Sequence, residues 1–135
     1  MSARATLVAA ATLAALAAGF HVSVQAQQTP AVKRTILQKQ GLQAEGQEGV
    51  MALLEIPPGA QEGRHTHPAE GFVYVMEGTL TVEMEGKPTA TYKAGDSFFI
   101  ERGKIHGGVN NGTTPVKAVA VFVADKGKPM TTQVK

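Results

Sequence analysis

Turn-forming residues divide this chain from residue 34 onward into short apolar runs, a spacing that leaves no room for long helices. The runs are rich in β-branched and aromatic residues, and none shows sustained helical periodicity. The turn clusters that separate them are Pro57-Pro58-Gly59, Glu77-Gly78, Glu85-Gly86-Lys87-Pro88, Ala94-Gly95-Asp96, Arg102-Gly103-Lys104 and Asn110-Asn111-Gly112. The sequence therefore predicts an all-β domain.

Nine runs are expected to form strands, at 34–40, 50–56, 64–67, 72–76, 79–85, 90–92, 97–100, 106–109 and 116–123. So many short strands favour a double-sheet antiparallel jelly roll or a small barrel. In the run 72–76, the two faces of the strand are both apolar, so we expect both to be at least partly covered, within a sandwich or at a subunit interface. The aromatic residues expected in the core are Tyr74, Phe98, Phe99 and Phe122.

The first quarter of the chain differs in kind from the rest. Arg4 precedes an uncharged, apolar run at 6–20, and Val24-Gln25-Ala26 follows as a small-residue cleavage pattern. We expect 1–26 to be a secretory signal, since the run is shorter than the ~20 apolar residues of a membrane-spanning helix; an uncleaved anchor is the alternative. The expected organisation is then a flexible lead at 27–33, one domain at 34–126 and a C-terminal tail at 127–135, in a periplasmic or secreted protein.

Charge and cysteine content exclude several classes of partner and site. Cleavage of the expected signal removes Arg4 and lowers the net charge from +2 to +1, and the remaining basic residues are spread along the chain. Nucleic acid is therefore not an expected partner, and no membrane contact is expected after signal cleavage. The chain has no cysteine, so neither disulfides nor thiolate ligands are available. In a domain of this size, a bound ion or a second subunit is expected to add stability.

Three of the four histidines, His65, His67 and His106, lie outside the expected signal. His65 and His67 are two residues apart, so on a strand their side chains share one face. Pro57, Pro58 and Pro68 disfavour a helix here. With Glu70 nearby, these residues predict a divalent transition-metal site, for which Fe, Mn, Ni, Cu and Zn are all candidates.

Two segments resemble the paired motifs of the cupin superfamily. The first motif is matched by Gly59, His65, His67, Glu70 and Gly78, and the second by Gly95, Gly103, His106 and Asn110, with Glu101 at its proline position. The resemblance spans 50–123 and is to small, single-domain, conserved-barrel cupins of type 2. It implies a jelly-roll β-barrel of two antiparallel sheets, a metal held by the three histidines inside the barrel mouth, and a homodimer.

Glu70 departs from the family pattern, in which the acidic ligand lies seven residues before the closing glycine. That position here is Gly71. By strand alternation, His67, Ala69 and Gly71 share a face, so Glu70 points away from the ion unless a bulge at Gly71 re-aims it. The site therefore has either four protein ligands or three histidines completed by water. A site without the carboxylate favours an anionic ligand, such as a carboxylate or enolate.

Other polar residues near the motifs are expected to be structural. Glu101 and Arg102 are expected in a solvated turn, and Asn110 is expected to cap the turn at Gly112. The expected function is that of an exported, metal-binding cupin that acts on a small organic molecule, with a metal-dependent dioxygenase first by analogy. The alternatives are a metal-dependent lyase or isomerase, a non-catalytic module that binds a small molecule or metal, and a metal-free dimerising scaffold.

Overall fold

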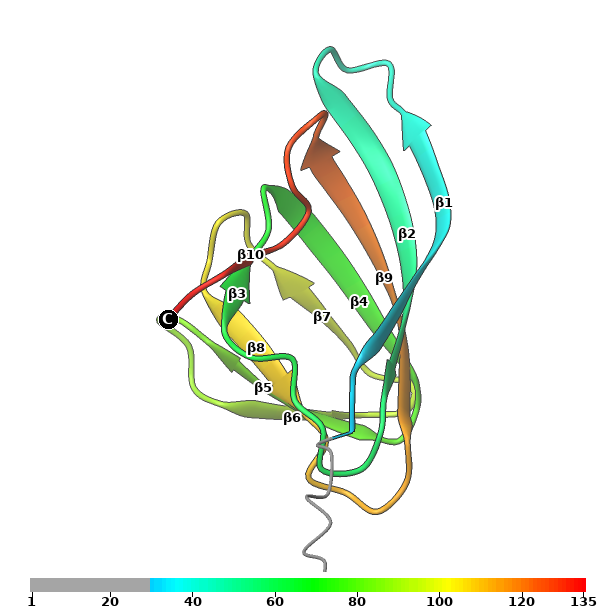
Figure 1. Ribbon diagram of the computed structural model, residues 1–135, viewed down its shortest axis with the longest axis vertical. Coiled ribbons are helices and arrows are strands. Elements are labelled where there is room, and N and C mark those ends of the chain that lie inside the picture. The colour runs from blue at the N-terminus through cyan, green and yellow to red at the C-terminus, as the bar shows by residue number, and fades with distance from the viewer. Residues whose placement is uncertain (1–29) are drawn as a thin grey trace, which may run out of the picture.

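The computed structural model describes residues 30–135, and within them the regular secondary structure consists of ten β-strands. The strands form two five-stranded sheets that face one another, as Figure 1 shows. Every pairing among these strands is antiparallel. The expected all-β, double-sheet jelly roll is confirmed, whereas the expected signal at 1–26 lies outside the described residues.

The first sheet contains, in spatial order, β1 (Lys33–Gly41), β2 (Gln47–Ile56), β9 (Val116–Asp125), β4 (Ala69–Glu77) and β7 (Ser97–Ile100). The second sheet contains β10 (Thr132–Gln133), β3 (His65–Thr66), β8 (His106–Val109), β5 (Thr79–Met84) and β6 (Ala90–Lys93). The nine expected strands are all present, within a few residues of the expected bounds. β10 is an addition that the sequence pattern did not predict.

The core lies between the sheets, because alternate residues of each strand point inward. In the central strand β9 this alternation buries Val116, Ala118, Ala120, Phe122 and Ala124. Leu80 and Val82 of β5 belong to the same buried cluster from the second sheet. Full burial of a valine, leucine or phenylalanine side chain contributes about 1.5–3 kcal/mol. This packing holds the two sheets together and fixes the positions of the short strands that carry the histidines.

The two faces of β4 are not equally covered. Val73 and Val75 are buried, whereas Phe72, Tyr74 and Met76 are 58%, 52% and 45% exposed on the outer face. The expectation that Tyr74 and Phe99 fill the core is therefore wrong, since Phe99 is also exposed and its ring lies 5.1 Å from that of Phe72. Of the other two aromatic residues, Phe122 is buried and Phe98 packs partly buried against the core. The outer face of the first sheet thus presents an apolar surface.

Asn110 is fully buried after β8 and ties together three segments. Its side-chain amide donates to the carbonyl oxygens of Ile56 and Thr114 at 2.9 and 2.8 Å. Its Oδ1 accepts a hydrogen bond from the backbone N–H of Gly112 at 2.9 Å, which confirms the expected turn cap. These bonds fix the loop that follows β8, the strand that begins with His106.

The C-terminal segment passes from the first sheet to the second, as Figure 1 shows. It leaves β9 at Asp125 and ends in β10, where Gln133 pairs with His65 of β3. On the way, Met130 packs against the core. The segment at 127–135, expected as a C-terminal tail, therefore includes a strand that lies beside β3. Within residues 30–135, no helix has the length and apolar character needed to cross a membrane.

Candidate metal centre

The three histidines converge inside the barrel. His65 in β3 and His106 in β8 are direct partners across an antiparallel pair, and His67 follows β3 by one residue. All three side chains are buried, with relative exposures of 1%, 4% and 7% for His65, His106 and His67. Each offers a ring nitrogen that lies within 4.8 Å of those of the other two. Zn²⁺ binds imidazole nitrogens at ~2.0–2.1 Å, so three nitrogens this close to one another suit a single shared ion.

Backbone carbonyl groups fix the orientation of every ring. The Nδ1 atoms of His65, His67 and His106 lie 2.9, 2.6 and 2.9 Å from the carbonyl oxygens of Gly63, Met130 and Lys104, respectively. A carbonyl oxygen only accepts hydrogen bonds, so Nδ1 carries the hydrogen and Nε2 keeps its lone pair free. This is the arrangement in which outer hydrogen bonds orient metal-binding imidazoles.

Burial keeps two of the imidazoles neutral. The pKa of His67 is lowered from 6.5 to about 4, chiefly because burial disfavours the charged ring, and the neighbouring His65 and His106 add to the effect. Burial also lowers the pKa of His106. The neutral imidazole is the form that binds a metal ion, so near pH 7 these rings require no proton loss before ligation.

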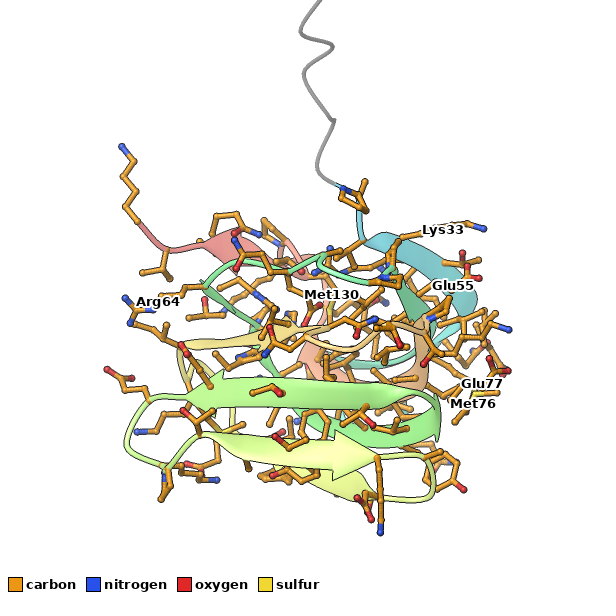
Figure 2. All side chains as sticks on the ribbon, turned by 90° about the horizontal axis from the view of Figure 1, so that it is seen from below. Lys33, Glu55, Arg64, Met76, Glu77 and Met130 are labelled. Atoms are coloured by element: carbon orange, nitrogen blue, oxygen red, sulfur yellow. The ribbon has the colours of Figure 1, made fainter. Side chains whose placement is uncertain are left out.

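A cavity of about 90 Å³ adjoins the histidines. Its walls are mostly aliphatic and aromatic, with Val73, Leu80 and Ile100 among them, and Met130 and Thr131 of the C-terminal segment line it as well. In Figure 2, Met130 lies near the middle of the molecule, whereas Arg64 extends at its edge. The cavity has room for a molecule of only a few non-hydrogen atoms.

Comparison with known proteins identifies the family. The Cupin domain family matches residues 52–122, more than half of the chain. This chain belongs to the cupin family. The match contains His65, His67 and His106, so the histidine cluster lies within the cupin domain itself.

Several cupins of known name or structure are similar to this one. Germin-like protein 1-1 of Oryza sativa subsp. japonica is 36% identical over 77 residues, 53% of this chain and 36% of that protein. The Oxalate-binding protein of Thermotoga maritima is 32% identical over 75 residues, 55% of this chain and 61% of that protein. A structure of oxalate oxidase matches with 30% identity and a TM-score of 0.58, over 64% of this chain and 46% of that one. This cupin thus covers about a third of the germin-like protein and less than two thirds of the other two.

Glu70 lies outside the histidine group of this cupin. Strand β4 pairs regularly with β9 through Glu70 and Gly71, opposite Val123 and Phe122, so no bulge turns the Glu70 side chain inward. Its two carboxylate oxygens instead accept hydrogen bonds from Arg102 at 3.1 and 2.7 Å. This placement corrects the candidate ligand set to His65, His67 and His106.

Arg102 lies in a turn, as expected, and its partly exposed side chain also acts as a structural clamp. Besides Glu70, its guanidinium donates to the Pro68 carbonyl oxygen at 2.9 Å and to the Asp125 carboxylate at 2.5 Å. The hydrogen bond from Arg102 lowers the pKa of Glu70, while Lys128 and Arg102 lower the pKa of Asp125. Glu101 points to Lys87 instead, at 2.6 Å. The clamp joins the start of β4 to the end of β9, next to His67.

Sequence reasoning missed two charged residues of the cavity, Arg34 and Glu62. Arg34 lies near the start of β1, and Glu62 precedes β3. They form an ion pair with a distance of 2.7 Å between Nη2 and Oε1. Neither residue belongs to the two cupin motifs quoted above, and no local pattern of either segment distinguishes a cavity residue from an exposed one. Only the packing of β1 against the loop before β3 brings them together.

Proposed function

We propose that this cupin binds one divalent transition metal through Nε2 of His65, His67 and His106 and acts on a small organic molecule beside it. The observation that carries the proposal is the convergence of three buried imidazoles, each held by a carbonyl group at Nδ1. Three neutral imidazoles suit Fe, Mn, Ni, Cu or Zn. When bound, such an ion supplies Lewis-acid or redox chemistry at its open positions.

Metal analysis of protein purified without chelators tests this proposal. We expect about one ion per chain in the wild type and loss of that ion in the variants His65→Ala and His106→Ala. A matched control is Glu70→Gln, which alters a nearby carboxylate outside the cluster and is expected to retain the ion. Wild-type protein that holds no stoichiometric ion after incubation with each candidate metal contradicts the proposal.

The proposed reaction class is an oxygen-dependent oxidation, and a dioxygenase is the first candidate activity. The similarity to an oxalate oxidase structure supports oxidation. Oxygen consumption is the measurement, with the Fe, Mn, Ni and Cu forms against oxalate and small diketones. Substrate turnover without oxygen uptake points to a lyase or isomerase instead.

A non-catalytic binding role is the second candidate, because one similar protein is named for oxalate binding alone. The narrow cavity of about 90 Å³ suits a small bound ligand as well as a small substrate. The two roles are separated by binding and turnover measured on the same metal-loaded preparation. Tight binding with no product over many hours favours the binding module, whereas product release favours the enzyme.

We further propose that the protein is exported, with residues 1–26 as the cleaved signal. The support is the apolar run at 6–20 and the small residues before Gln27. The mature protein is then periplasmic or secreted. Mass spectrometry of protein from the periplasm or medium is expected to find a chain that starts at Gln27, whereas an intact N-terminus contradicts cleavage.

A homodimer is proposed through the outer face of the first sheet. Phe72 pairs with Phe99 on β7 and with Val121 on β9, and all three are exposed. Exposed apolar patches of this kind mark interaction surfaces. Light scattering after gel filtration is expected to give a dimer for the wild type and a monomer for Phe72→Lys. A wild-type monomer at tens of micromolar protein contradicts this assignment.

A further inference from the structure

Arg34 and Glu62 place a pair of opposite charges on the wall of the histidine cavity. They are the only aspartate, glutamate, lysine or arginine residues among the described residues that line it. Glu62 is nearly buried, with a side-chain exposure of 9%, whereas the Arg34 side chain is 36% exposed. Arg34 belongs to the edge strand of the first sheet, and Glu62 belongs to the loop before β3 of the second. The pair therefore spans the two sheets beside the candidate metal centre.

Glu62 is held firmly in this position. Its backbone N–H donates to the Gly108 carbonyl oxygen at 2.9 Å. Its Oε2 lies 2.9 Å from the place where a Cβ on Gly108 would lie, so only the absence of a side chain at 108 makes room for the carboxylate. The carboxylate is thus seated over β8, the strand that begins with His106.

Arg34, by contrast, uses little of its hydrogen-bonding capacity. Among the described residues, its guanidinium makes one hydrogen bond, from Nη2 to Glu62. The guanidinium of Arg102 makes more hydrogen bonds than that of Arg34. It donates through Nε, Nη1 and Nη2, and all of these bonds are structural. A guanidinium carries five N–H donors in a fork that matches a carboxylate. Most donors of Arg34 therefore have no acceptor within residues 30–135.

Both charged side chains line the same cavity as His65, His67 and His106. Both charges are therefore close enough to affect the energy of an anion placed in the cavity. The other walls of the cavity are mostly apolar, and in such surroundings a single guanidinium attracts an anion more strongly than it does in water.

We propose that Arg34 recognises the carboxylate of a small organic acid that enters the histidine cavity, and that Glu62 occupies Arg34 until the acid replaces it. This inference deepens the proposed function, since it assumes that the three histidines hold a metal. The cavity of about 90 Å³ limits the ligand to an acid of a few non-hydrogen atoms, such as a hydroxy acid or a short dicarboxylic acid. Arg34 then determines specificity, and Glu62 sets the affinity by competition.

The proposal predicts opposite effects for the two partners of one ion pair. Arg34→Gln removes the cation and weakens acid binding, by about tenfold or more if hydrogen bonds to a charged group are lost. Glu62→Gln removes the competing anion and tightens acid binding severalfold. A salt bridge with a purely structural role predicts instead that both substitutions weaken binding alike. Arg64→Gln is the matched control, because Arg64 is exposed and does not line this cavity (Figure 2).

The experiment is isothermal titration of the Zn²⁺-loaded full chain with glycolate and with its neutral analogue glycolamide. Zinc content and melting temperature are measured first for each variant. We expect glycolate to bind the wild type at least tenfold more tightly than glycolamide, Arg34→Gln to lose this preference, and Arg64→Gln to keep it. Arg34→Lys, which keeps the charge but not the fork, is expected to fall between the wild type and Arg34→Gln.

Failure of the proposed function and failure of the role of Arg34 give different results. If the wild type holds neither zinc nor any other candidate metal, the proposed function fails and this inference fails with it. If zinc binds but glycolate affinity is absent, is unchanged in Arg34→Gln or falls in Glu62→Gln as it does in Arg34→Gln, only the role of Arg34 is overturned.

Discussion

Phe122 occupies the space that a side chain at Gly71 would need. A Cβ placed on Gly71 would lie 2.7 Å from Cε1 and 2.9 Å from Cδ1 of the Phe122 ring. The same ring packs edge-on against His67, with 4.8 Å between ring centroids. The inward-facing position 71 of β4 thus carries no carboxylate, and an aromatic ring covers one side of His67.

The first prediction concerns the energetic coupling of this pair. Gly71→Ala is expected to lower the free energy of unfolding by about 1–3 kcal/mol in the wild type, because the new Cβ overlaps the ring. In a Phe122→Ala background the same substitution is expected to cost much less, since the overlap is gone. Urea denaturation of all four proteins gives the coupling energy. Additive effects of the two substitutions contradict the close contact.

The second prediction is that a carboxylate at position 71 reaches the ion only when Phe122 is removed. Gly71→Glu with Phe122→Ala is expected to hold metal more tightly against a competing chelator than Phe122→Ala alone. Gly71→Gln with Phe122→Ala is the control, because it fills the same space without the anionic ligand. Equal metal retention in the Glu and Gln variants shows that position 71 does not face the ion.

The jelly roll and the histidine group could be predicted from the sequence because both depend on local features. Turn residues set the strand ends, and the spacing of two between His65 and His67 places both on one face. Alternation also indicated that Glu70 points outward. Whether a bulge reverses this depends on the pairing of β4 with β9, which a single chain segment does not encode.

The parts that could not be predicted depend on long-range packing. The carbonyl partner of His67 is Met130, 63 residues away, and β10 consists of only two residues. Tyr74 is an aromatic residue of a type common in cores, yet it lies on an exposed face. This could not be predicted, because the sequence of a single strand does not indicate which of its two apolar faces meets the second sheet. Arg34 and Glu62, 28 residues apart, meet only when β1 has docked.

The third prediction is that the C-terminal segment tunes metal affinity through a backbone carbonyl. Deletion of residues 130–135 removes the acceptor for Nδ1 of His67 and is expected to weaken metal binding about 10–100-fold. Met130→Ala is the matched control, because it keeps the carbonyl oxygen, and its affinity is expected to stay near that of the wild type. Competition with a metal-sensitive dye measures both. Unchanged affinity after deletion contradicts this role of the Met130 carbonyl.

The fourth prediction is that the ion stabilises the folded domain. A ligand that binds only the folded state, present at 100 times its Kd, adds about 2.7 kcal/mol. Chelation is therefore expected to lower the Tm of the wild type by on the order of 10 °C. His65→Ala serves as the control, since a chelator should not change its Tm. Demonstrated metal loss with an unchanged melting curve means that the barrel does not depend on the ion.

The fifth prediction concerns acid and the Arg102 clamp. The clamp holds the pKa of Glu70 below its usual range, so the folded state binds a proton on Glu70 less readily than the unfolded chain does. The stabilisation is full above the unfolded pKa near 4.5 and disappears as the pH falls through the folded value. The difference in Tm between metal-free wild type and Glu70→Gln is thus expected to be constant from pH 7 to about 5.5 and to shrink below pH 4.5.

His67 also titrates near pH 4, but its contribution is common to both proteins and cancels in the difference. A Tm difference that grows on acidification contradicts the clamp.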